Sequence, residues 1–106
     1  MVTIEELVEE LGIDREDVLE FVSVFLDYTE NEDFPALMKG MKTEDYEEVR
    51  KRAHSIKGAA LNLKLTEVAA LAAQLEKQAG TGNLDNGPVL CEAILEKMKL
   101  IREELV

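Results

Sequence analysis

The sequence contains only one cysteine, Cys91, and only one histidine, His54, among 106 residues. A lone cysteine cannot form an internal disulfide or a thiolate metal cluster, which excludes disulfide-stapled folds and zinc fingers. A lone histidine excludes a di-iron carboxylate bundle, because that site needs a Glu-x-x-His pair from each of two helices. We expect Cys91 to be a small core residue, and we predict no metal site in this chain.

Long apolar runs are also missing. The longest extends over only a few residues, whereas a membrane-spanning helix needs about 20. Residues 1–13 alternate glutamate pairs with apolar residues, unlike a signal peptide. These features predict a cytoplasmic protein with no membrane interaction. The length favours a single domain over residues 1–106.

Positive charge is scarce and unevenly placed. Twelve basic residues stand against 23 acidic ones, giving a net charge of −11. Nucleic acid is therefore not expected as a partner, because its phosphates would repel the chain. Residues 1–34 contain Arg15 as their single basic residue, whereas residues 50–57 form a short basic island of Arg50, Lys51, Arg52 and Lys57.

Several enzyme signatures are absent. The sequence has no glycine-rich phosphate loop of the Walker or dinucleotide type, no His-Glu-x-x-His motif, and no serine flanked as in a nucleophile elbow. Any catalytic site in this chain must therefore consist of few residues.

The hydrophobic pattern predicts an all-α protein, because sustained period-two alternation is missing and helix-forming residues are abundant. Thr3 and Gly12 are predicted to cap a short first helix. Asp14 is predicted to cap a second helix, whose apolar positions are Val18, Phe21, Val22, Phe25 and Leu26. We expect the aromatic rings of this helix, Phe21, Phe25 and Tyr28, in the core. A ring exposed near the histidine would instead anchor a partner.

Pro35 is predicted to break or kink the second helix near residues 31–34. Leu37 and Met38 then resume the apolar stripe, and Gly40 is expected to close the region. Thr43 is the predicted N-cap of the third long segment. The inward positions of that segment recur at steps of four and three residues: Val49, Ala53, Ile56, Ala60 and Leu63.

Two more helices are predicted after residue 65. The first is capped by Thr66 and stops at Gly80, and the second opens near Pro88. Cys91 lies on the inward stripe of the last helix together with Ile94, Met98, Ile101 and Leu105. Four long amphipathic segments joined by short turns predict an antiparallel four-helix bundle, with the short N-terminal helix covering one end.

His54 is predicted to stand at the surface of this bundle. It follows the inward Ala53 by about 100° of helical rotation, and its own face also carries residues at i−4, i+3, i+4 and i+7, namely Arg50, Lys57, Gly58 and Leu61. A neutral imidazole is a good nucleophile near pH 7, and its phosphoryl adduct is reactive. Lys57 can stabilise phosphoryl oxygens from one turn away. Glycine costs about 1 kcal/mol in a helix interior, so Gly58 suggests that a partner approaches closely.

The segment from Ala53 to Leu63, with His54, Lys57 and Gly58, resembles the His-x-Leu-Lys-Gly signature of histidine-containing phosphotransfer domains. Ile56 stands where the family usually has leucine. The short leading helix, the motif's place in the third long helix and the total length extend the resemblance over essentially the whole chain.

The resemblance implies a four-helix bundle that exchanges a phosphoryl group with the aspartate of a response-regulator receiver domain or a hybrid sensor histidine kinase. It implies that His54 is the phosphoacceptor, that Lys57 supports the phosphoryl group and that Gly58 provides clearance for docking. Arg50 and Leu61 are further predicted docking contacts. The chain would be a phosphocarrier without independent turnover or cofactor, with Mg²⁺ on the receiver, and a monomer.

Two other hypotheses remain open from the sequence. The first is an interaction module that occupies receiver surfaces without being phosphorylated. The second is the phosphoacceptor module of a chemotaxis-type histidine kinase, phosphorylated by an ATP-binding domain elsewhere.

Overall fold

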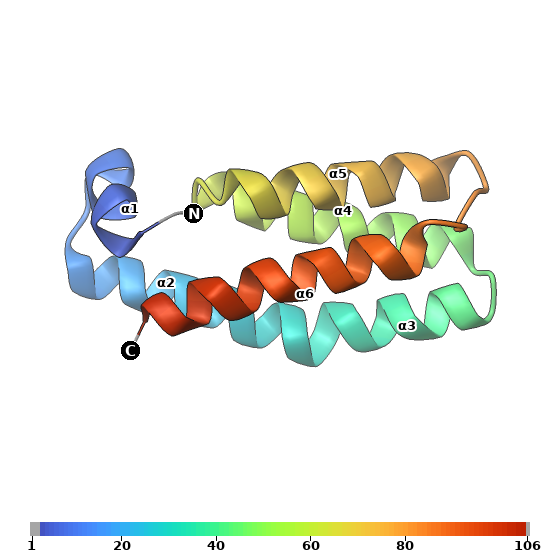
Figure 1. Ribbon diagram of the computed structural model, residues 1–106, viewed down its shortest axis with the longest axis horizontal. Coiled ribbons are helices and arrows are strands. Elements are labelled where there is room, and N and C mark those ends of the chain that lie inside the picture. Colours follow the sequence, from blue (N-terminus) through green and yellow to red (C-terminus); the bar gives the residue numbers. More distant parts are fainter. Residues whose placement is uncertain (1–2, 106) are drawn as a thin grey trace.

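The computed structural model describes residues 3–105, and all regular elements in this range are helices (Figure 1). In chain order they are α1 Ile4–Leu11, α2 Arg15–Tyr28, η1 Thr29–Asp33, α3 Phe34–Lys42, α4 Tyr46–Asn62, α5 Thr66–Gly80 and α6 Gly87–Glu104. The all-α prediction is confirmed for these residues.

The long helices form the predicted antiparallel four-helix bundle. Elements α2, η1 and α3 run on as the first long helix, and short turns reverse the chain before α4, α5 and α6 in succession (Figure 1). α4 packs against both α3 and α5, and α6 packs mainly against α5. The helix that carries His54 therefore lies between two neighbours, with one surface seam on each side.

Helix α1 crosses one end of the bundle and packs on α2 (Figure 1). The side chain of Thr3 accepts a hydrogen bond from the backbone N–H of Glu6, and Gly12 ends the helix with a φ of 66°. Both caps are as predicted. Ile4 and Leu7 are buried. Burial of each contributes about 2 kcal/mol, which holds a helix too short to be stable alone.

Pro35 does not break the long helix formed by α2, η1 and α3. Residues 29–33 instead form a π-helix, in which the Phe34 N–H bonds to the Thr29 carbonyl, and Pro35 lies in the first turn of α3. The wider π-turn keeps the backbone helical up to a residue that has no N–H to donate, so the predicted irregularity is a change of hydrogen-bond register.

The inward seam of α4 is confirmed at Val49, Ala53, Ile56 and Ala60, which are all fully buried. Cys91 is also buried, and burial raises the pKa of its thiol to about 11. The thiol is therefore protonated at neutral pH and unreactive, as expected of a core residue.

The prediction that all three aromatic rings of α2 lie in the core was wrong. Phe25 is buried, but Phe21 and Tyr28 are about half exposed. The buried arc is centred on Val18, Val22 and Leu26. Phe21 and Tyr28 lie outside its centre, about 100° and 120° around the helix from Val22. Met38 is also exposed, off the apolar stripe.

Three predicted helix boundaries need correction. Gly40 does not end a helix but lies inside α3, where a Cβ would come within 2.8 Å of the Val49 side chain. The lack of a Cβ at Gly40 lets α3 approach α4 closely. Thr43 is the C-cap of α3, and Asp45 caps α4 by accepting a hydrogen bond from the Glu48 N–H. Thr66 is the first residue of α5, one position after its N-cap.

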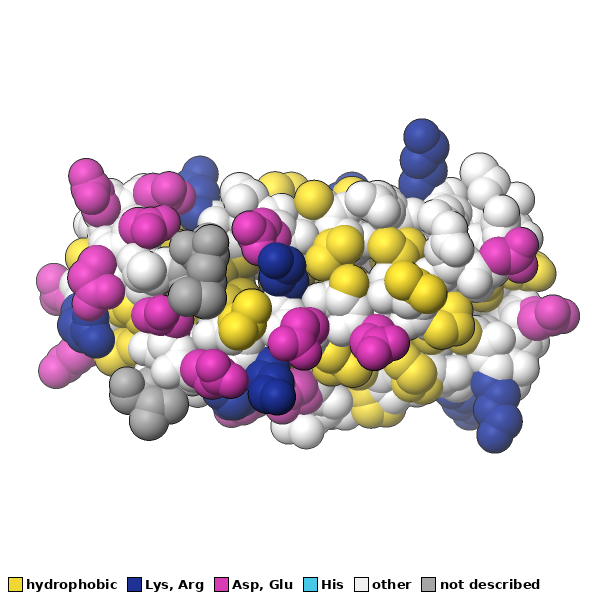
Figure 2. All heavy atoms as spheres, in the orientation of Figure 1, with side chains coloured by type: hydrophobic (Ala, Val, Ile, Leu, Met, Phe, Trp, Pro, Cys, Tyr) yellow, Lys and Arg dark blue, Asp and Glu magenta, His cyan; other side chains and the backbone are white. Residues whose placement is uncertain are grey.

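The surface charge is uneven. Acidic side chains gather at the end of the bundle that carries α1, whereas apolar side chains are exposed along the middle of the face over α6 (Figure 2). Within residues 3–105, no helix is both long and apolar enough to cross a membrane.

Candidate functional site

His54 lies in the middle of α4 and points away from the core. The inward positions Ala53 and Ile56 on either side of it are fully buried, so the intervening position must face outward. The His54 side chain is 63% exposed. The prediction that the imidazole lies at the surface is therefore confirmed.

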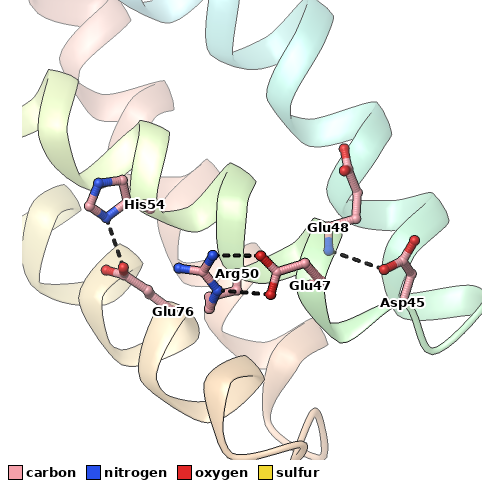
Figure 3. Close-up of polar contacts among 6 residues, drawn as sticks. All are labelled: Asp45, Glu47, Glu48, Arg50, His54 and Glu76. Atoms are coloured by element: carbon pink, nitrogen blue, oxygen red, sulfur yellow. Dashed lines mark hydrogen bonds and ion pairs between the residues drawn. The ribbon is translucent and has the colours of Figure 1, made fainter.

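Glu76 on α5 holds one edge of the imidazole. The Nδ1 atom of His54 lies 2.8 Å from Oε2 of Glu76 (Figure 3). An ionised carboxylate only accepts hydrogen bonds, so Nδ1 is the donor, and in the neutral ring the lone pair is then on Nε2. Figure 3 shows the second ring nitrogen on the side away from Glu76. The geometry leaves Nε2 as an accessible nucleophile.

Lys57 reaches the same carboxylate from one turn further along α4. Its Nζ lies 2.7 Å from Oε1 of Glu76, while Oε2 faces His54. The Lys57 ammonium, and to a smaller extent the His54 ring, hold the pKa of Glu76 below its usual range. Glu76 is therefore ionised at neutral pH, as the assigned tautomer of His54 requires. The three side chains form one polar cluster at the seam between α4 and α5.

The side chains of the basic island have different partners. The Arg50 guanidinium pairs with Glu47 on its own helix at 2.6 and 3.1 Å (Figure 3). Glu47 lies on the side of Arg50 away from His54 in the sequence of α4, and Cδ of Arg50 lies next to Gly80 of α5. Arg52 lies on the other side of α4, where it contacts Glu48 and the buried Asp33. Of these cations, Lys57 is the one that joins the histidine cluster.

Gly58 and Leu61 extend the outward face of α4 beyond His54. A Cβ built on Gly58 would meet no atom within 4 Å, so packing within the bundle does not require a glycine there. Leu61 is about half exposed. The surface beside the imidazole is therefore apolar, and at Gly58 it has no projecting side chain. The docking roles predicted for the two residues remain predictions.

Glu76 is the site residue that sequence reasoning missed. It is 22 residues from His54 and lies on another helix. A signal was available in the turn between α4 and α5, because an antiparallel hairpin centred on residue 65 places residue 54 opposite residue 76. The same register brings Gly80 close to Arg50.

Comparison with known proteins identifies the fold and the family of the chain. No curated protein sequence matches the chain. Among solved structures, the chain is similar to histidine-containing phosphotransfer protein B (HptB) from Pseudomonas aeruginosa PAO1, with a TM-score of 0.82 and 23% identity over 93% of this chain and 85% of that one. At 23% identity, this structural similarity establishes the fold alone. The Hpt domain family model matches residues 3–104. The chain therefore belongs to the Hpt domain family, which acts in histidine phosphotransfer within phosphorelays.

Proposed function

We propose that this protein carries a phosphoryl group on Nε2 of His54 and exchanges it with the aspartate of a response-regulator receiver domain. The observation that supports this most directly is the hydrogen bond between Nδ1 and Glu76, because it directs the lone pair of an exposed imidazole outward. Family membership supports the general role of histidine phosphotransfer.

The transfer step needs no proton movement at the nucleophile. The Nε2 lone pair attacks the phosphorus of the receiver's acyl phosphate. The N–P bond forms as the bond between phosphorus and the aspartate oxygen breaks, and the released carboxylate keeps the electron pair. Because Nδ1 keeps its proton, the phosphorylated ring becomes cationic. The carboxylate of Glu76, 2.8 Å away, stabilises that charge. The same steps in reverse return the group.

Lys57 supplies positive charge beside the reacting group. Its ammonium is bound to Glu76 in the resting state and lies one helical turn from His54. Phosphoryl transfer depends mainly on positioning and charge stabilisation, so Lys57 can contact the phosphoryl oxygens as they arrive. We expect the receiver to provide the remaining groups, including Mg²⁺, and the protein to have no turnover alone.

Phosphorylation with two donors tests the proposal. Phosphoramidate is a small donor that needs no protein docking, and a panel of receiver domains charged with acetyl phosphate supplies the physiological type of donor. We expect both to label the wild-type chain and neither to label His54→Gln. Ser55→Ala is the matched control for the phosphoramidate arm, because Ser55 adjoins His54 and is also exposed. Its label from that donor should equal that of the wild type.

The chemistry of the label identifies the acceptor atom. Phosphohistidine is lost in acid and phosphoserine is not, and ¹⁵N NMR of the ring distinguishes phosphorylation on Nε2 from that on Nδ1. Label retained by His54→Gln would contradict the proposal. Receiver binding without any label on the wild type would favour the unphosphorylated interaction module instead.

A further inference from the structure

The ion pair between Lys57 and Glu76 opposes one step of the proposed transfer. At rest the Lys57 Nζ lies 2.7 Å from Oε1 of Glu76, and the Glu76 side chain is only 18% exposed. To contact a phosphoryl group on Nε2, the ammonium must loosen this pair, because Nε2 lies on the edge of the ring away from Glu76 (Figure 3). A mostly buried carboxylate that loses its cation is destabilised unless another positive group replaces it. The cationic ring provides that charge in full only once the N–P bond has formed.

Arg50 lies one helical turn before His54, on the α5 side of α4. A Cβ built on Gly80 would be 3.9 Å from Cδ of Arg50, so the stem of the arginine lies against α5. Gly80 follows Glu76 by one helical turn. The arginine therefore occupies the next level of the same seam between α4 and α5 that contains the Glu76 cluster.

One side of the Arg50 guanidinium is open toward this cluster. Its Nε and Nη2 atoms donate to Glu47 at 3.1 and 2.6 Å, which uses one edge of the planar group. Nη1 makes no hydrogen bond to a residue in the described range 3–105. Figure 3 shows this third nitrogen on the side that faces His54 and Glu76. The hydrogen bond to Glu47 raises the pKa of Arg50, and the negative charge of Glu76 adds to that increase.

The contact with Glu47 does not fix Arg50 in its resting position. Both side chains are well exposed, Arg50 at 40% and Glu47 at 67%. Exposed ion pairs between residues i and i+3 are weak, because water and salt screen them and two long side chains must be held still. The guanidinium is always charged, so a change of partner needs no proton transfer.

We propose that Arg50 is a positioning residue of the phosphotransfer site. It replaces Lys57 as the cation at Glu76 while the lysine contacts the phosphoryl group, and Glu47 limits its availability by binding it at rest. The inference rests on the proposed function and deepens it, because it names the group that releases Lys57. No covalent bond is made or broken at Arg50. Glu76 stays ionised throughout and continues to accept the hydrogen bond from Nδ1 of His54.

Arg50→Gln and Glu47→Gln should change the rate of phosphorylation by phosphoramidate in opposite directions. We expect Arg50→Gln to lower this rate about threefold, the size typical of one partly exposed ion pair. Arg50→Lys keeps the charge and should retain most of the wild-type rate. Glu47→Gln releases the guanidinium and should raise the rate about twofold. Lys99→Gln, at an exposed position of α6, controls for the loss of one positive charge and should have no effect.

A double-mutant cycle shows whether Arg50 acts through Glu76. In a Glu76→Gln background there is no negative charge for the arginine to hold, so Arg50→Gln should have no further effect. Glu47→Gln should likewise leave the rate unchanged when residue 50 is already glutamine. Circular dichroism checks that each variant folds. A merely structural role of Arg50 would give the same loss in both backgrounds.

Three outcomes would overturn the proposal while the wild type is still phosphorylated at His54. The first is an unchanged phosphoramidate rate in Arg50→Gln, which includes a loss seen only with the receiver as donor, because that would mean a role in docking. The second is a loss of equal size in the Glu76→Gln background, because Arg50 would then act on the phosphoryl group itself or on the fold. The third is a Glu47→Gln rate at or below that of the wild type. If neither donor phosphorylates the wild type at His54, the proposed function itself fails.

Discussion

The two sides of helix α4 differ in charge, in polarity and in what they can do. Toward α5, Glu76 binds both His54 and Lys57 within hydrogen-bond distance. Toward α2, an apolar groove begins at the next residue, Ser55. Only the α5 side carries the side chains that the proposed function assigns to the chemistry of transfer. Substitutions on the two sides should therefore have separable effects.

Lys57→Ala should have the largest effect on the charged side. Loss of one charged donor at a reacting phosphoryl group lowers the rate by about a hundredfold or more. Because the loss concerns chemistry, the phosphoramidate and receiver rates should fall together, which single-turnover assays with both donors will measure. Lys64→Ala, an exposed lysine beyond the end of α4, is the control. If only the rate of transfer from the receiver fell, Lys57 would contribute to docking of the receiver and not to the chemistry.

Gly58→Phe should affect the receiver rate alone. The glycine has open space where a side chain would project, so a ring there obstructs the visiting protein without disturbing the bundle. We expect transfer from the receiver to weaken by at least about tenfold, equivalent to 1.4 kcal/mol of binding. Phosphoramidate labelling separates this obstruction from damage to the imidazole.

Gly58→Ala is the matched smaller change. Alanine in a helix interior should raise the free energy of unfolding by about 0.5–1 kcal/mol, measured by urea denaturation. A stabilised protein with weakened receiver transfer would show that the glycine serves docking. Stabilisation with an unchanged receiver rate for both Gly58 variants would argue against the clearance role.

The sequence was most informative where the relevant contacts are local. Buried positions of α4 recur at steps of three and four residues because helix periodicity alone determines which side chains face inward. The outward display of His54 followed from the same periodicity. The caps at Thr3 and Gly12 were also predictable, since they depend on neighbouring residues only.

Contacts between helices were harder to predict. Glu76 could be assigned to the site only from the register of the α4–α5 hairpin, which depends on the turn between the helices. Phe21 and Tyr28 lie at the margin of a buried arc, where a small rotation of α2 decides between core and surface. The π-turn before Pro35 was not predictable from proline alone, because a break, a kink and a change of register all accommodate its missing N–H.

Glu76→Gln should have a moderate effect. The glutamine oxygen still accepts the Nδ1 proton, but the negative charge that binds Lys57 and stabilises the cationic phosphorylated ring is lost. We expect phosphoramidate labelling to slow about three- to tenfold, because a hydrogen bond to a neutral amide stabilises the cationic ring less than one to a carboxylate. Glu76→Leu, which removes the acceptor, should be slower still. Equal rates in Glu76→Gln and the wild type would show that the negative charge of Glu76 does not contribute to phosphorylation.

The pH dependence of stability gives a second measurement on Glu76. Because Lys57 lowers the pKa of Glu76 in the folded state, the resulting stability is fully present above the pKa of an unfolded glutamate. It is lost as the pH falls through the lower folded pKa. The difference in free energy of unfolding between the wild type and Glu76→Gln should therefore shrink on acidification. A constant difference would contradict the lowered pKa.

Double-mutant cycles test the separation of the two sides directly, and here the expected coupling is the smallest effect. Lys57→Ala and Val24→Asp alter opposite sides of α4, so their fold-changes in receiver transfer should multiply to within about twofold, a coupling below about 0.5 kcal/mol. Lys57→Ala and Glu76→Gln share one ion pair, so their effects should not multiply. Strong coupling in the first cycle would mean that the two sides of α4 act together in transfer, because energetic independence requires that neither substitution changes the contacts of the other.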